Sequence, residues 1–144
     1  MDASAISQII FLIILLIFSA FFSSAETALT TVNKIRMRTL ADDGNKRAER
    51  VLRITDDSHK MLSAILIGNN IVNLSASSLA TTLAIKLWGS VGAGIATGIL
   101  TFLILVFGEI SPKTFATLYA DQISIAYSGI IGFLMKILTP VIFL

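Results

Sequence analysis

The chain has 144 residues, of which 55% are hydrophobic and 14% charged, and its mean hydropathy is +0.85. Soluble domains carry about 25% charged residues, so this composition argues against a soluble globular protein and for a membrane protein. The sequence has no cysteine and a single histidine, His59, which excludes disulfides and thiolate sites and leaves too few ligands for zinc or haem. The net charge is only +2, so the positions of the charges are more informative than their sum.

The first apolar stretch runs from about residue 6 to residue 31 and predicts a membrane span. A cleaved signal peptide is the alternative, with the small residues 23–25 as its cleavage site. The residues before the stretch include Asp2 but no Lys or Arg, and the basic residues follow it, which is the wrong polarity for a signal peptide. We therefore expect an uncleaved span with its N-terminus outside.

Residues 32–60 form a polar segment that holds eight of the eleven Lys and Arg residues. Because Lys and Arg concentrate in cytoplasmic loops, this segment is predicted to be cytoplasmic. Asp42-Asp43-Gly44-Asn45 predicts a turn between two short amphipathic helices, and Asp56-Asp57-Ser58 predicts the N-cap of the next helix. Such helices are typical of a surface on anionic lipid. Nucleic-acid binding is disfavoured, because no aromatic residue is interleaved with the basic ones.

Two further apolar stretches, at about 61–88 and 91–119, predict an outward and a returning span. Lys86 and Trp88 lie where interfacial anchors are expected at the outer surface. Gly94 and Gly98 form a GxxxG pattern, which predicts close helix contact within the protomer or across a dimer.

The fourth stretch, 123–144, is apolar apart from Lys136. It fits either an outward span or a helix in the membrane interface with the Lys136 ammonium reaching the headgroups. The sequence stops at Leu144 within apolar residues, so we expect the natural chain to continue.

Ionisable groups inside spans are costly and mark functional candidates, and Glu26 and Glu109 are the two clear cases. Between them in sequence lie Asn69, Asn70 and Asn73. At about 1.5 Å per residue, Ser24, Asn70 and Glu109 lie about 10–15 Å from the cytoplasmic ends of their helices. The three polar clusters are therefore expected to share one level in the membrane.

Helical spacing places polar side chains in a stripe on each of two spans. The stripes are Ser19, Ser23, Glu26 and Thr30 on the first, and Asn70, Asn73, Ser77 and Thr81 on the second. Two facing polar stripes favour a route for water or ions. Interhelical hydrogen bonding is the alternative and explains the Ser and Thr residues well, but not three Asn and two Glu residues.

Pro112 has no N–H to donate to the carbonyl of Gly108, four residues earlier, beside Glu109. The pattern therefore predicts a freed carbonyl next to a carboxylate, together with Asn amides and Ser hydroxyls, Ser23 included. Such oxygen ligands suit hard cations such as Mg²⁺, Ca²⁺ or Na⁺. A simple proline kink is the alternative.

Three motifs together resemble the transmembrane domain of the CorC/CNNM family of magnesium transporters. They are Ser23-Ser24-Ala25-Glu26-Thr27-Ala28, Gly68-Asn69-Asn70-Ile71-Val72-Asn73 and Gly108-Glu109-Ile110-Ser111-Pro112-Lys113. Their order and spacing match across the whole chain. The resemblance implies a cation site at Ser24, Asn70, Gly108 and Glu109, with Glu26 and Asn73 nearby.

The resemblance also implies a fold: an all-α homodimer in the cell membrane, with three transmembrane helices per protomer, cytoplasmic amphipathic helices and a C-terminal juxtamembrane helix. Cytosolic CBS domains are expected after Leu144. They require the chain to end inside, which assigns 123–144 to the juxtamembrane helix. Residues 1–144 would then be one ion-transport domain.

The function expected from this resemblance is Mg²⁺ export coupled to Na⁺ entry, by alternating access. A passive divalent-cation channel is one alternative, and a membrane anchor and Mg²⁺ sensor for the cytosolic domains is another. An intramembrane protease is disfavoured, because both carboxylates lie among Asn and Pro residues typical of ion ligation. We therefore expect no enzyme activity.

Overall fold

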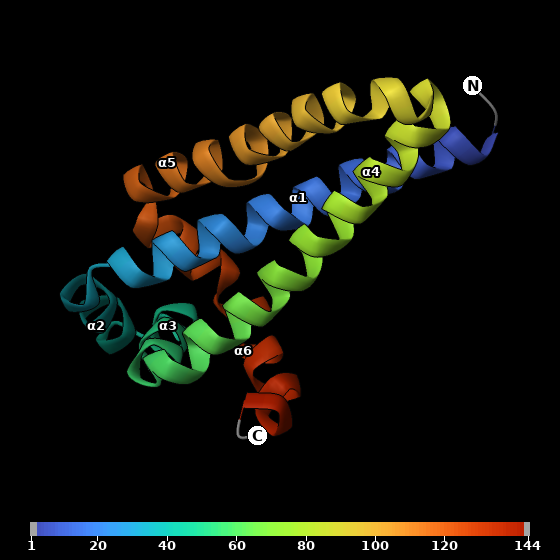
Figure 1. Cartoon of the computed structure of the whole chain (residues 1–144). Coiled ribbons are helices and arrows are strands. Elements are labelled where there is room, and N and C mark those ends of the chain that lie inside the picture. Colours follow the sequence, from blue (N-terminus) through green and yellow to red (C-terminus); the bar gives the residue numbers. More distant parts are fainter. Residues whose placement is uncertain (1–2, 143–144) are drawn as a thin grey trace.

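The computed structural model describes residues 3–142 and consists, over that range, of helices (Figure 1). In chain order they are α1 (Ala3–Thr31), α2 (Lys34–Asp42), α3 (Lys46–Asp56), α4 (Ser58–Leu105), the π-helix η1 (Val106–Ile110), α5 (Ser111–Leu118) and α6 (Ala120–Ile142). The prediction of an all-α membrane protein is confirmed.

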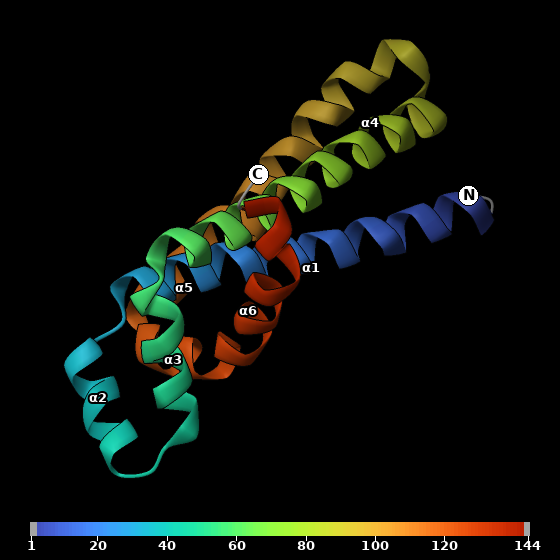
Figure 2. The same cartoon turned by 90° about the horizontal axis from the view of Figure 1, so that it is seen from below.

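Four segments of the described chain are long and apolar enough to cross a membrane: Ala3–Thr31, Ser58–Ser90, Gly94–Leu118 and Ala120–Val141. The expected count of three is therefore wrong by one, because the segment expected to lie in the interface passes the same test. The last two residues of the predicted segment 123–144 lie outside the described residues. Apolarity over 23 residues suits both a span and an interfacial helix, so the sequence pattern alone could not fix the count. Figures 1 and 2 show α6 at a steep angle to α1.

A sharp turn divides α4 into an outgoing arm and a returning arm. Gly89 has φ 70° and ψ −179° inside the helix, a left-handed φ that favours glycine. The break lies in the short gap that separates the two apolar stretches in sequence. Lys86 Nζ donates to Ser4 Oγ at 2.8 Å, so this turn and the start of α1 lie at the same end of the molecule.

The polar segment 32–60 forms two short helices at the opposite end. Gly44, with φ 95°, makes the turn between them, as predicted. The Asn45 side chain caps α3 by accepting from the Ala48 N–H at 3.0 Å. Asp57 caps α4 by accepting from the Lys60 N–H at 3.4 Å, which confirms the predicted cap.

The main buried core lies at this end, where α1, α2, α3, α4 and α6 meet. Its fully or nearly fully buried members include Ala25, Leu29, Met37, Val51, Met61, Ile65 and Ile131. Helix α1 packs tightly against α4 at Gly68, where an added Cβ would lie 2.6 Å from the Phe22 ring. The first residue of the Gly68–Asn73 motif is therefore required by packing.

Gly68→Ala is predicted to destabilise the domain by about 1–3 kcal/mol, because the new methyl group overlaps the buried Phe22 ring. Adding Phe22→Leu should recover part of this loss by opening space. Gly94→Ala is the matched control, since nothing lies within 4 Å of its Cβ position, and it should gain up to about 1 kcal/mol from helix propensity. Unfolding of the purified variants in detergent measures all three, and equal stabilities of Gly68→Ala and Gly94→Ala would contradict the packing argument.

Candidate functional site

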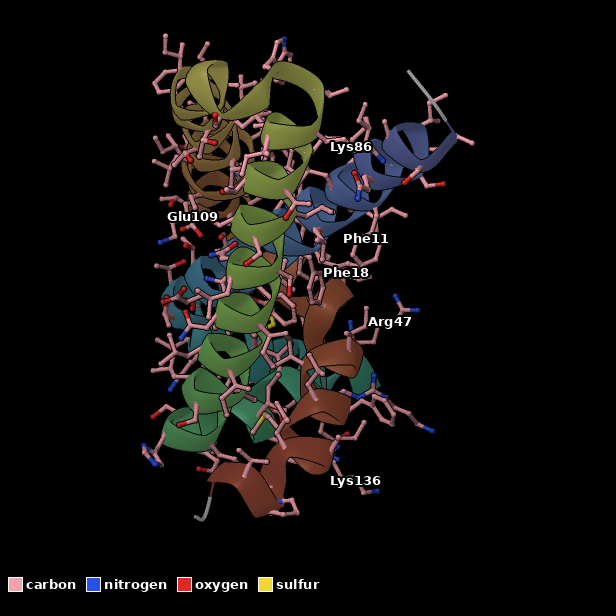
Figure 3. The ribbon with its side chains drawn as sticks, turned by 45° about the vertical axis from the view of Figure 1, so that its right-hand side comes forward. Phe11, Phe18, Arg47, Lys86, Glu109 and Lys136 are labelled. Carbon is pink, nitrogen blue, oxygen red and sulfur yellow. The ribbon has the colours of Figure 1, made fainter. Side chains whose placement is uncertain are left out.

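Asn73 connects three helical elements through its side-chain amide. Its Nδ2 donates to Glu109 Oε1 of η1 at 3.0 Å, and its Oδ1 accepts from Ser19 Oγ of α1 at 2.7 Å. Asn69 lies one turn earlier on α4, and its Oδ1 is 3.5 Å from Asn73 Nδ2. The structure therefore brings Asn73 into contact with Glu109, whereas the predicted common depth names Asn70 together with Glu109. Figure 3 shows Glu109, of η1, beside the middle of the outgoing arm of α4.

The backbone at Glu109 is a π-helix rather than an α-helix. The Ser111 N–H donates to the carbonyl of Val106, five residues earlier. Pro112 follows directly and has no N–H for the Gly108 carbonyl. Insertions of this kind occur frequently at functional sites.

Gly108 is buried against α1. A Cβ at this position would lie 2.9 Å from Ser19 Oγ, so only glycine allows the approach. The Gly108 carbonyl lies 3.4 Å from Ser19 Oγ. A hydroxyl has one proton, and the shorter contact to Asn73 takes it. The Gly108 carbonyl therefore receives only a weak contact from Ser19.

Lys113 supplies the nearest positive charge to Glu109. Its Nζ lies 3.7 Å from Glu109 Oε2, one helical turn away, and the Glu109 side chain is 22% exposed. The two carboxylate oxygens thus have different partners, the Asn73 amide and the Lys113 ammonium. Within residues 3–142, no three His, Cys, Asp or Glu side chains gather as a metal cluster. Any cation here would rely on one carboxylate and neutral oxygens.

Other candidate ligands are not joined to this cluster by hydrogen bonds. The Ser24 hydroxyl is buried and donates to the Phe21 carbonyl of its own helix at 3.0 Å. Asn70 is exposed. The Glu26 carboxylate is partly buried and, within the described residues, makes no hydrogen bond or ion pair. Ser23 Oγ is buried without a hydrogen-bond partner.

Ser24 instead lines a cavity between α1, η1, α5 and α6. The cavity has a volume of about 490 Å³, and Ser111 and Pro112 also line it. Pro112 thus contacts the cavity and is also the residue four positions after Gly108 in the chain. Of the candidate ligands of α1, Ser24 therefore lines this cavity, and none is hydrogen-bonded to the Asn73 cluster.

Three residues of the cluster were absent from the predicted ligand set. Ser19 stands in the predicted stripe of α1, one turn before Ser23, so its spacing carried the signal. Asn69 belongs to the motif that begins at Gly68. Lys113 is four residues after Glu109. This is the spacing of a helical ion pair, so the pair could be predicted from the sequence.

Gly94 and Gly98 make no close contact within the described chain, because a Cβ at either would meet nothing within 4 Å. Of the two predicted uses of this pattern, contact within the protomer is therefore wrong. A contact across a dimer stays a prediction.

Residues 10–144 match the family described as the Cyclin M transmembrane N-terminal domain, CNNM. The chain belongs to the CNNM family. The family's description names a transmembrane domain, which agrees with the long apolar helices of the fold. The expected family is confirmed.

Relatives of this CNNM domain include longer proteins from bacteria. The chain is 46% identical to a UPF0053 protein of Haemophilus influenzae over 100% of its own length and 34% of the relative's. It is 41% identical to the UPF0053 inner membrane protein YfjD of Escherichia coli, over 88% of this chain and 29% of that protein. A Haemophilus influenzae protein named polyamine export protein is 26% identical over 93% of this chain and 34% of its own length. The CNNM domain thus spans about a third of the length of these curated relatives.

Asn73→Leu is predicted to destabilise this CNNM domain by about 0.5–2 kcal/mol, because it leaves Glu109 and Ser19 without their amide partner. Asn70→Leu removes the same groups from an exposed position and should change stability little. Thermal unfolding of both purified variants in one detergent makes the comparison. Equal effects would show that Asn73 does not hold the three elements together.

Proposed function

We propose that the chain is the ion-translocating domain of a Mg²⁺ transporter, which exports Mg²⁺ in exchange for Na⁺ by alternating access. The observation that supports it most directly is the Glu109 carboxylate, held by Asn73 beside the Gly108 carbonyl. A carboxylate among apolar helices is costly and calls for a cationic partner. Irregular backbone at membrane depth is tolerated where it is buried in protein or lines a cavity, and Gly108 is buried.

The surrounding oxygens suit a hard cation. Mg²⁺ takes oxygen ligands in octahedral geometry and usually keeps several waters, so one carboxylate and a few neutral oxygens are enough. The Gly108 carbonyl, next to Glu109 in the chain, supplies one such oxygen. The buried Ser23 hydroxyl has no hydrogen-bond partner and is proposed as a second. Ser24, Asn70 and Glu26 remain proposed ligands, by resemblance to the family.

The Lys113 ammonium competes with any cation for the Glu109 carboxylate, since it lies 3.7 Å from Oε2. Both are positive, and a cation that binds Oε2 must displace the ammonium or share the carboxylate with it. Because the Lys113 side chain is long, flexible and 46% exposed, its ammonium can move away from Oε2 when a cation binds. Lys113 therefore tunes the affinity of the site without blocking it.

Glu109→Gln is expected to weaken Mg²⁺ binding by about tenfold or more, because it removes the charge of a central ligand and keeps its shape. Lys113→Gln should strengthen binding by about two- to fivefold, since a competitor is lost. Calorimetry with Mg²⁺ on the purified domain measures both, and Asp56→Asn in the polar segment is a control for general loss of negative charge. Unchanged affinity in Glu109→Gln would remove Glu109 from the site.

A second candidate cargo is a polyamine. Glu109 already pairs with a primary ammonium, that of Lys113, and a polyamine carries the same group. One relative is named a polyamine export protein. Its identity to this chain is lower than that of the other two relatives, so Mg²⁺ is the preferred cargo.

The orientation and assembly are also proposals. The eight basic residues of the polar segment support a cytoplasmic position for Lys34–Lys60 and an external N-terminus. By resemblance to the family, we propose a homodimer, and the open surface at Gly94 and Gly98 is its candidate interface. Cytosolic CBS domains in the full-length protein are proposed by the same resemblance.

The full-length protein in vesicles is predicted to carry Mg²⁺ outward with a saturable rate that increases with an opposing Na⁺ gradient. Glu109→Gln should abolish this flux, while Asp56→Asn should preserve it. A fluorescent Mg²⁺ indicator follows the transport. Flux that neither saturates nor depends on Na⁺ would indicate a channel, and spermidine flux without Mg²⁺ flux would indicate the polyamine cargo. Absence of both, with intact folding, would favour the anchor and sensor function.

A further inference from the structure

A second charged site lies between α3 and α6. It is a pocket of about 240 Å³ with three basic side chains, Arg50 and Arg53 of α3 and Lys136 of α6. Figure 3 shows Lys136 extending outward from α6, well separated from Glu109. The pocket is therefore distinct from the candidate cation site, and its charge has the opposite sign.

The backbone of α6 is shaped to receive the arginines. A Cβ at Gly129 would lie 2.8 Å from Arg50 Nη1, so the guanidinium rests directly over the helix at a position without a side chain. Gly132, one turn further along α6, also lines the pocket. Two glycines thus open the wall of α6 where the basic side chains converge.

The three charges have no counter-ion among the described residues. No acidic residue lines the pocket, and within residues 3–142 none of the three basic side chains makes a hydrogen bond or ion pair. Arg36, by contrast, pairs with Asp121 at 3.4 Å. Three like charges around so small a volume repel one another, so the pocket is suited to a bound anion.

An apolar stripe adjoins the pocket and indicates which anion. Phe133 lines the pocket and also belongs to a row of exposed apolar side chains on one face of α6, at helical spacing. The row is Ile130, Phe133, Ile137 and Val141, each between 51% and 63% exposed. A ligand with an anionic head and an apolar tail would fill both parts at once.

We propose that this pocket binds the phosphate of an anionic phospholipid, with an acyl chain along the apolar stripe of α6. Basic pockets between helices on the cytoplasmic side are suited to such headgroups, and the cytoplasmic leaflet is anionic. Arginine makes bidentate contacts to phosphate oxygens, and two arginines one turn apart supply two such forks. The bound lipid would cross-link α3 to α6.

The test compares two variants of the whole chain that lose equal charge. Arg50→Gln with Lys136→Gln removes two charges of the pocket, and Lys34→Gln with Arg38→Gln removes two exposed charges of α2. Native mass spectrometry in detergent measures binding of phosphatidylglycerol and of phosphatidylcholine with identical acyl chains. The pocket variant should lose its preference for phosphatidylglycerol by about tenfold or more, and the α2 variant should keep it within about twofold.

Arg53→Gln alone replaces the double variant if the latter does not fold, and a loss of about fivefold is then expected. Preference kept in the pocket variant, or lost equally in the α2 variant, would overturn the proposal in favour of general surface charge. Inorganic phosphate is titrated into the chain by calorimetry as a separate arm. Phosphate binding as tight as that of phosphatidylglycerol would show a free-anion site and overturn the lipid assignment.

Discussion

The structure depends on how a carboxylate is accommodated among apolar helices. Glu109 accepts a hydrogen bond from the Asn73 amide and forms an ion pair with the Lys113 ammonium. Because the Asn73 carbonyl also accepts from Ser19, satisfying Glu109 fixes the rotation of α4 and α1 about their axes as well as that of η1. In a bilayer there is no water to take the place of these partners, so the three elements are specified together by one amide.

Two glycines make this arrangement possible. The absence of a side chain at Gly68 lets the Phe22 ring pack against α4. The absence of a side chain at Gly108 lets Ser19 pack against η1. Helices in membranes lack a hydrophobic drive to associate and rely on close packing instead. Since Ser19 and Phe22 are one turn apart on α1, the two close approaches support each other, and a side chain at either glycine would separate the polar groups.

Much of this could be predicted from sequence, because it rests on local rules. The apolar stretches, the cap at Asp57 and the common depth of the Ser24, Asn70 and Glu109 clusters follow from composition and helical rise. The direction in which each side chain points does not. Ser24 satisfies its hydroxyl on its own helix, and Asn70 lies on an exposed face, although both are at the right depth. Depth is a property of one helix, whereas direction depends on how neighbouring helices pack.

The π-helix explains why η1 in particular could not be read from helical periodicity. An α-helix turns by about 100° per residue, and a π-helix adds a residue to one turn. Every residue after the insertion is therefore rotated relative to an unbroken helix counted from Gly94. This rotation accompanies a backbone in which Gly108 faces Ser19 and Glu109 faces Asn73. Because Pro112 has no N–H, a regular α-helix would also lack the hydrogen bond to the Gly108 carbonyl here. The π-helix therefore does not sacrifice that bond. The proline thus lowers the cost of the insertion, and the insertion directs the carboxylate to its amide partner.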